Sequence, residues 1–170
     1  MRFLAFIGLL AIIAGILVAG YFFGGFFDVA ATWEDPGPVA SALARVRNAS
    51  IGRHAHDQPP IALDQPEAIQ TGARHYAKYG CSNCHGAPGV EWAKFSEGLN
   101  PGPPDLKEVA PERDPAALFW VVKNGIRMTG MPSFGKAGVP DPELWQIVAF
   151  LKKLPSVSEA DFKTWTAEAQ

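Results

Sequence analysis

The sequence predicts an all-α protein in which one N-terminal membrane-spanning helix precedes a single domain built from a few helices. The chain begins with a long apolar run that carries no charge. Beyond it, hydrophobic residues recur at helical spacing, and no segment shows the alternating pattern of a strand. Glycine and proline interrupt a long central stretch, which limits the number of regular helices. A chain of 170 residues provides one domain and a short appendage.

Residues 3–27 form an uncharged run of 25 residues between Arg2 and Asp28, long enough to cross a bilayer as a helix. A cleaved signal peptide would have a shorter apolar core, and residues 18–20 offer only a weak cleavage site. We therefore expect residues 1–28 to be a retained anchor. Arg2 precedes the run, whereas Arg45 is the first basic residue after it. The positive-inside rule then places the N-terminus in the cytoplasm and the rest of the chain outside.

Residues 29–63 are predicted to be a linker that contains a short helix over about residues 39–50. Val39, Leu43 and Val46 form its apolar stripe, and the arginines around it suit a membrane surface or an acidic partner. A solvated spacer helix is the alternative. His54 and His56 adjoin a proline-rich extended segment, so neither is expected to ligate a metal.

Residues 64–155 are predicted to form the helical domain, with residues 156–170 as a C-terminal tail. A first helix runs from about residue 66 to 79, with Asp64 as its cap. Later helices start at Asp114 and Asp141 and end near residues 124 and 153. The stretch 86–113 is rich in glycine and proline, and a loop of that length in a compact domain implies that something fills the space it encloses.

The pentapeptide Cys81-Ser82-Asn83-Cys84-His85 contains the only two cysteines of the chain. Cys-x-x-Cys-His is typical of covalent haem c attachment, in which both thiols form thioether bonds to one haem and the histidine ligates its iron. A zinc site would need a fourth ligand from a distant histidine. A thioredoxin-like dithiol would lie in a βαβ unit, and a disulfide here would close a very short loop. The motif therefore predicts one haem c, attached through Cys81 and Cys84, with His85 as an iron ligand.

A second iron ligand is expected from the loop between the last two helices, where the only methionines besides Met1 are found. A thioether is a soft ligand, and histidine–methionine ligation raises the haem reduction potential. Met131 is flanked by Gly130 and Pro132, which indicates a close-fitting loop, so we assign it as the sixth ligand. Met128 is the alternative candidate for the sixth ligand. If it is not the ligand, we expect it to pack at the edge of the haem macrocycle.

This combination resembles the class I monohaem cytochrome c family over residues 64–154. The resemblance rests on the haem motif, the Gly130-Met131-Pro132 turn, and the Gly72/Tyr76 pair that faces Trp145 where the family crosses its first and last helices. It implies the class I cytochrome c fold around one haem. It also implies that a backbone carbonyl near Pro103 or Pro104 orients His85, and that Pro104 and Leu106 of the Gly-Pro-Pro-Asp-Leu stretch contact the cofactor.

Two occupied axial positions leave no site for a substrate, so the expected function is electron transfer and not enzymatic catalysis. We expect the domain on the periplasmic face of a bacterial inner membrane, where it passes single electrons between redox partners in or at the membrane. The expected partners are a dehydrogenase, a quinol-oxidising complex or a terminal reductase. No nucleic acid partner is expected. Lys123, Arg127 and Lys136 suit docking of an acidic partner. The alternative is a haem-based sensor or enzyme in which the methionine ligand is displaced.

Overall fold

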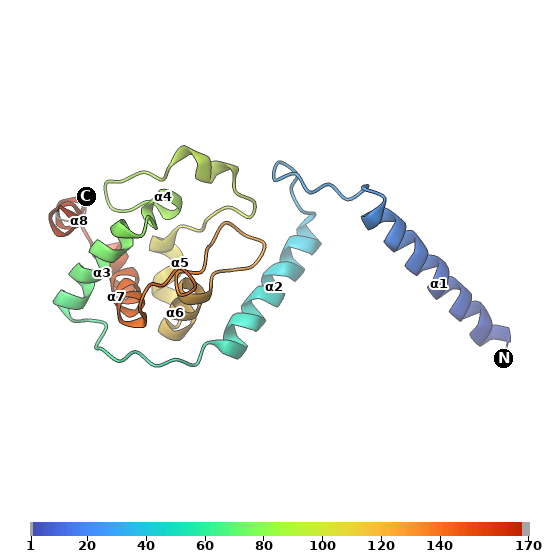
Figure 1. Ribbon diagram of the computed structural model, residues 1–170, viewed down its shortest axis with the longest axis horizontal. Coiled ribbons are helices and arrows are strands. Elements are labelled where there is room, and N and C mark those ends of the chain that lie inside the picture. Colours follow the sequence, from blue (N-terminus) through green and yellow to red (C-terminus); the bar gives the residue numbers. More distant parts are fainter. Residues whose placement is uncertain (1, 168–170) are drawn as a thin grey trace. The chain divides into compact units, whose positions relative to one another are not determined.

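A computed structural model describes residues 2–167 of the chain (Figure 1). The described part is helical, apart from an isolated bridge between Ala87 and Val90. It separates into two compact units, Met1–Glu34 and Asp35–Gln170. The predicted all-α class with one apolar N-terminal helix is therefore confirmed.

The first unit consists of helix α1 (Arg2–Phe23) and the short segment that follows it. All side chains of α1 are exposed, and its length and composition suffice for one membrane span. The helix ends four residues earlier than the apolar run, because Gly24 and Gly25 follow and Gly25 has a φ of 77°. Rings of Tyr21, Phe22 and Phe27 contact one another at this end of the helix.

The core of the second unit is the crossing of α3 (Pro66–Lys78) with α7 (Asp141–Lys153). Gly72 lies at the contact, where an added Cβ would overlap the carbonyl oxygen of Gln146. Tyr76 is buried on the same face, and its ring centroid lies 5.1 Å from that of Phe150. Glycine at position 72 thus permits the close approach of the two helices.

Trp145 does not occupy the position expected from the resemblance. The predicted partner of the Gly72/Tyr76 pair was Trp145, but the structure places Gln146 and Phe150 there. Trp145 stacks on Phe119 of α6 (Pro115–Asn124), with ring centroids 4.1 Å apart. Residues 146 and 150 are one turn apart on α7 and therefore share the face that contacts α3. Trp145 points to a different side of α7, toward α6.

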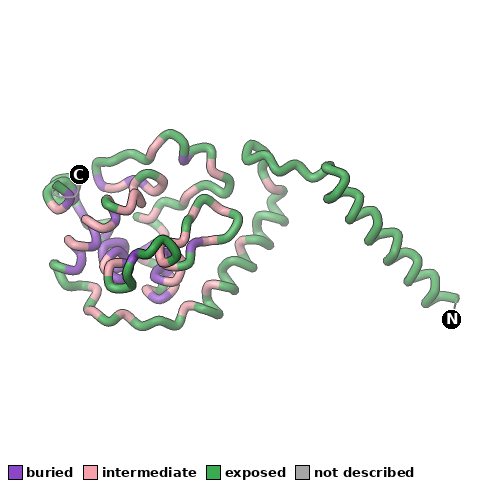
Figure 2. Tube along the Cα trace, viewed as in Figure 1, coloured by how far each residue is buried: buried purple, intermediate pink, exposed green. Residues whose placement is uncertain are grey.

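Two helices lie where no helix was expected. Helix α5 (Leu106–Glu112) lies within the predicted loop 86–113, and Asp105 caps it by accepting a hydrogen bond from the Lys107 amide. Helix α8 (Glu159–Thr166) lies in the predicted tail and is capped by Ser158. Its Phe162 is buried, with its ring 5.7 Å from that of Phe150. Figure 2 shows these buried positions gathered around α3 and α7.

The remaining elements are short, apart from α2 (Gly37–His54). They are α4 (Ser82–His85), the 3₁₀ helix η1 (Lys94–Gly98) and the 3₁₀ helix η2 (Leu154–Ser156). Asp114 caps α6 as predicted, by accepting a hydrogen bond from the Ala116 amide at 2.7 Å. The predicted caps Asp64 and Asp141 are wrong. The N-cap positions are Gln65 and Pro140, because α3 begins two residues after Asp64 and α7 begins at Asp141 itself.

A polar cluster closes one end of the α3–α7 crossing. Glu143 of α7 accepts a hydrogen bond from the Tyr79 hydroxyl, and one of its carboxylate oxygens lies 3.3 Å from Nε2 of His75 and 3.8 Å from Nζ of Lys78. Nδ1 of His75 is buried and has no hydrogen-bond partner. Burial lowers the pKa of His75 below 6.5, although the nearby Glu143 opposes this shift. Hydrogen bonding from Tyr79 lowers the pKa of Glu143.

These shifts predict an acid-labile fold. A histidine with a lowered folded pKa binds its proton more readily when unfolded, so its contribution to stability is lost as the pH falls below about 6.5. Because the pKa of Glu143 is lowered in the folded state, its contribution to stability is also lost as the pH falls, at lower pH than for His75. We expect His75→Gln to flatten the decline in the guanidinium unfolding midpoint between pH 7 and pH 5. The exposed His56→Gln is the control, and an equal decline in wild type and His75→Gln would contradict this account.

Candidate haem site

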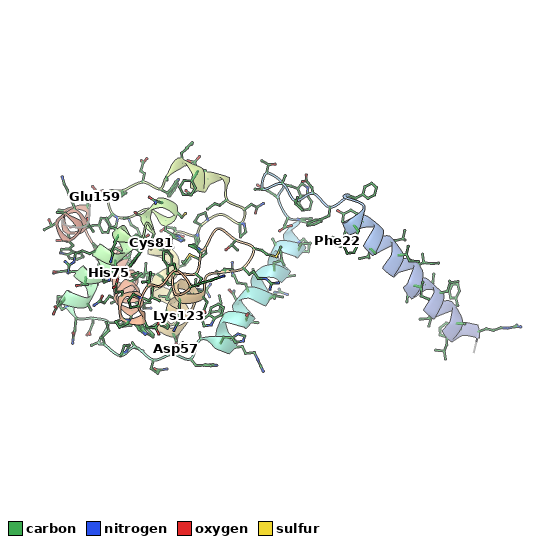
Figure 3. All side chains as sticks on the ribbon, viewed as in Figure 1. Phe22, Asp57, His75, Cys81, Lys123 and Glu159 are labelled. Atoms are coloured by element: carbon green, nitrogen blue, oxygen red, sulfur yellow. The ribbon has the colours of Figure 1, made fainter. Side chains whose placement is uncertain are left out.

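The two cysteines lie on a single turn at the C-terminal end of α3. Gly80 adopts a φ of 72°, which ends α3 and allows α4 to begin directly after Cys81. The amide of Cys81 donates to the carbonyl oxygen of Tyr76 at 3.1 Å, and the amide of His85 donates to that of Cys81. Cys81 and Cys84 are both half-buried and do not form a disulfide. Cys81 is labelled in Figure 3. The turn therefore presents two free thiols and an imidazole within five residues.

The environment of Cys81 does not favour thiolate chemistry. Burial raises the pKa of its thiol to about 12. A redox-active dithiol requires a lowered thiol pKa. Moreover, no group of three or more histidine, cysteine or carboxylate side chains in residues 2–167 could hold a metal ion by itself. The cysteine pair thus lacks the features of the zinc and dithiol alternatives.

The imidazole of His85 is oriented by the carbonyl oxygen of Pro104, which lies 3.0 Å from Nδ1. Because a carbonyl can only accept a hydrogen bond, the proton of the neutral ring is on Nδ1 and the lone pair is on Nε2. Burial lowers the pKa of His85, with the Pro104 carbonyl opposing that shift. The ring is therefore neutral at neutral pH, and Nε2 is available as a metal ligand.

The turn that carries His85 is held by Tyr76 from within the core. The Tyr76 hydroxyl donates a 2.7 Å hydrogen bond to the carbonyl oxygen of Gly86, and Gly86 itself is buried with a φ of 65°. Burial raises the pKa of Tyr76 far above its usual value, so the hydroxyl remains protonated and remains a donor. This hydrogen bond connects the α3–α7 crossing to the haem motif.

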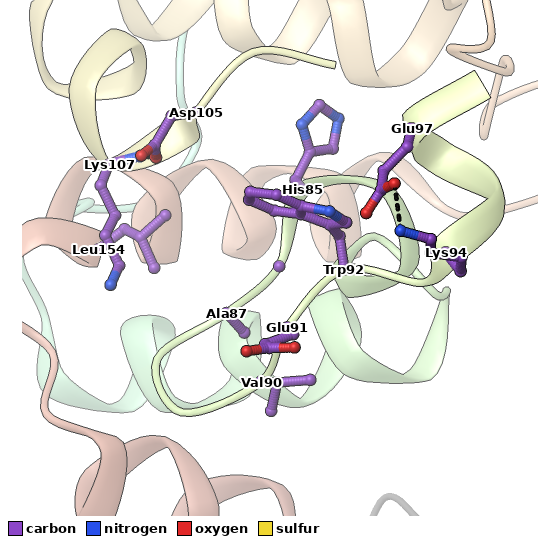
Figure 4. Close-up of a pocket in the computed structure, with 11 residues that line it drawn as sticks. His85, Ala87, Val90, Glu91, Trp92, Lys94, Glu97, Asp105, Lys107 and Leu154 are labelled. Carbon is purple, nitrogen blue, oxygen red and sulfur yellow. Dashed lines mark hydrogen bonds and ion pairs between the residues drawn. The ribbon is translucent and has the colours of Figure 1, made fainter. Parts of the chain in front are cut away.

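A cavity of about 540 Å³ lies beside His85. Figure 4 shows the imidazole next to the indole of Trp92 and pointing away from Ala87 and Val90. Carboxylates and lysines of residues 91–107 line the rest of the cavity. Cys81, Cys84 and Met131 do not line this cavity among the described residues. The cavity therefore lies next to His85 on the side of the 86–97 loop. The sequence does not identify Trp92 as a site residue, because no local pattern in its loop indicates which side chains lie beside His85.

Met131 lies in a loop fastened to the end of α6. Its carbonyl oxygen accepts a 3.2 Å hydrogen bond from the Ile126 amide, and its own amide donates to Oγ1 of Thr129 at 3.1 Å. Oγ of Ser133 donates to the Lys123 carbonyl at 2.7 Å. Met131 is half-buried against the hydrophobic core. The thioether is thus carried by a segment whose backbone is fixed on both sides of it.

This loop also meets the segment that leads to Pro104. A Cβ at Gly130 would lie 2.8 Å from a methyl carbon of Leu99, so the two segments approach closely here. Leu106 is the first residue of α5 and is half-buried against the core. The two loops predicted to flank the cofactor are therefore in contact with each other.

Met128 and Lys123 lie in different surroundings from Met131. Met128 is 88 % exposed and has a φ of 61°, so it lies outside the core, while Met131 is half-buried. Lys123 forms an ion pair with Asp141 at 2.7 Å and lies over the ring of Phe119. Its charge is therefore partly balanced within the domain, while Arg127 and Lys136 are exposed.

The donor set present fits a covalently attached haem. Two free thiols three positions apart match the two bonds that such a haem requires, and the adjacent histidine has Nε2 free. The remaining thioether of Met131 is half-buried. When bound, the haem would supply an iron that accepts and releases one electron.

A family model described as cytochrome c oxidase, cbb3-type, subunit III, matches residues 67–151, which is half of the chain. The matched segment includes the cysteine turn, Pro104 and Met131, and it excludes α1 and α2. No curated protein and no solved structure matches the chain.

Proposed function

The chain belongs to the cbb3-type subunit III family of c-type cytochromes, and on that premise we propose that it is a membrane-anchored electron carrier with one haem c attached through Cys81 and Cys84. In this proposal His85 and Met131 would hold the iron. The family itself carries covalently bound haem and transfers electrons. The single haem, its ligand pair and its partners are the parts that we propose.

The observation that carries the proposal is the Nδ1–Pro104 hydrogen bond of His85. It fixes the tautomer and the ring orientation of a histidine that directly follows two free thiols, and such a second-shell contact strengthens a metal ligand. A structural disulfide would not need a histidine oriented in this way, and a zinc site would need further ligands grouped with it, which residues 2–167 do not provide. The half-buried Met131 supplies the soft ligand that suits haem iron.

The residues of the site perform tasks that an electron carrier requires. Tyr76 and Pro104 hold the turn and the imidazole, and the backbone hydrogen bonds of the 126–135 loop hold Met131. Ligands fixed by the protein in this way rearrange little when the charge of the iron changes. Two protein ligands would leave the iron no open position for a substrate. We therefore propose electron transfer without enzymatic turnover.

The anchor and the family together support a place at a respiratory membrane complex. Helix α1 is long and apolar enough to span a bilayer, and the aromatic rings at its C-terminal end match the side chains that gather at membrane interfaces. Arg2 directly precedes the span, whereas the first basic residue after it is Arg45, and this difference close to the span favours a haem domain on the periplasmic face. We propose that the partners are membrane proteins of a respiratory oxidase chain.

Haem attachment and ligand exclusion test the proposal directly. We expect the full chain, produced with its haem and denatured in detergent, to retain haem covalently, and the double variant Cys81→Ala/Cys84→Ala to lose this covalent retention because both thioether bonds are removed. The reduced wild-type protein should not bind carbon monoxide rapidly. Absence of covalent haem would refute the proposal, and rapid carbon monoxide binding would favour a sensor or enzyme in which Met131 leaves the iron.

A further inference from the structure

Helix α2 presents an apolar stripe that nothing in the described structure covers. Val39, Leu43 and Val46 are 44 %, 56 % and 67 % exposed. At 3.6 residues per turn these three side chains fall within about 60° of one another around the helix axis. They therefore form one narrow stripe, which we call the α2 stripe.

Helix α2 contacts the haem domain through residues other than those of the α2 stripe. Helix α2 packs against α6, and the ring of His54 stacks on Trp120 with centroids 6.1 Å apart. Ile51 and Ala44, the half-buried residues of the helix, lie about 120° around the axis from the α2 stripe. His54, at the C-terminal end of α2, lies about 50° from the centre of the α2 stripe, but Val39, Leu43 and Val46 themselves remain exposed, so the α2 stripe is not used in this contact.

The charges of α2 are of one sign. The helix carries Arg45, Arg47 and Arg53 and no carboxylate, although the chain as a whole has a net charge of −2. On the helical wheel Arg47 and Arg53 flank the α2 stripe, while Arg45 lies about 130° away from its centre. Long cationic side chains beside an apolar stripe allow a helix to lie in a membrane interface, with the charges reaching lipid phosphates.

We propose that the α2 stripe lies in the headgroup region of an anionic bilayer, next to the proposed anchor. This inference rests on the proposed function, because it needs α1 to span the membrane. Residues 24–36 separate α1 from α2, and a chain of that length reaches at most about 45 Å. A tether of this kind gives α2 a high effective concentration at the membrane surface. Three apolar side chains and two arginines are then enough to keep the helix bound to the bilayer.

The consequence is an oriented haem domain. Since α2 is attached to α6, and α6 leads directly into the loop that carries Met131, the bilayer would fix which side of the domain faces the membrane. The domain would then approach a membrane partner with a restricted set of orientations. A flexible spacer would leave all orientations open.

The test uses the full, haem-loaded chain in vesicles that contain phosphatidylglycerol and phosphatidylcholine. In that state Cys81 and Cys84 are consumed by the haem, so Leu43→Cys adds one cysteine for a spin label. We expect the label at position 43 to collide several-fold less with a water-soluble nickel complex than with oxygen. Arg45→Cys, two residues away on the water-facing side, is the matched control and should collide freely with both. Val46→Cys repeats the measurement if Leu43→Cys is poorly made.

Three outcomes would overturn the proposal. Equal nickel accessibility of the labels at positions 43, 45 and 46 would show that the α2 stripe is solvated. Shielding that is accompanied by spin–spin broadening and lost on dilution with lipid would assign the stripe to a second copy of the chain. Shielding that appears only when membrane protein extract is added would assign it to a protein partner. The visible spectrum of the same samples shows whether His85 and Met131 still ligate the iron, so a failure of the electron-transfer proposal is recognised separately.

Discussion

Met131→Ala should lower the midpoint potential of the haem by more than about 100 mV, because axial ligands set haem potentials over a range of about 0.8 V and methionine raises the potential. The substitution removes a thioether from a loop whose backbone is held by Ile126, Thr129 and Ser133. The loop should therefore keep its course, and the loss should be confined to the ligand. The weak long-wavelength band of methionine-ligated oxidised haem should also disappear, and the reduced variant should bind carbon monoxide.

Met128→Ala is the matched control for this experiment. Met128 lies in the same loop, three residues before Met131, but its side chain is 88 % exposed. Its removal should leave the spectrum, the potential and the resistance to carbon monoxide unchanged. Redox titration of both variants in detergent, followed in the visible spectrum, measures the difference. An unchanged potential in Met131→Ala, or a lowered one in Met128→Ala alone, would reassign the ligand.

The sequence was informative wherever local chemistry decides the structure. Asp114 caps its helix as its position predicts. The anchor was visible as an uncharged run. The class I cytochrome c resemblance led to the right stretch for the carbonyl that orients His85, since the backbone of Pro104 lies there.

What the sequence could not show depends on contacts between distant segments. Helix α5 contains Pro111 and follows a run of prolines, so its local pattern indicates a loop. Helix α8 has only eight residues, and isolated helices of that length are marginal. It is stabilised because Phe162 is buried near Phe150. The position of Trp92 beside His85 likewise follows from the course of a loop, which periodicity does not reveal.

Gly72→Ala should destabilise the haem domain by about 3 kcal/mol, at the upper end of the usual cost of overpacking a core. The added Cβ would overlap the carbonyl oxygen of Gln146 and lie 2.6 Å from its carbonyl carbon. These are backbone atoms of α7, so no side-chain rotation relieves the contact. The helices must separate, and Tyr76 would then lose its packing against Phe150.

Gly52→Ala provides the opposite control, since a Cβ at Gly52 of α2 meets no atom within 4 Å. Alanine in an exposed helix should leave stability unchanged or raise it by up to about 1 kcal/mol. Guanidinium unfolding of both haem-loaded variants, followed by far-UV circular dichroism, measures the two effects. Equal unfolding midpoints for wild type and Gly72→Ala would mean that the α3–α7 crossing is looser than described. Because Tyr76 also holds Gly86 beside His85, a real separation of the helices should shift the haem spectrum as well, which connects the packing of this crossing to the iron ligand.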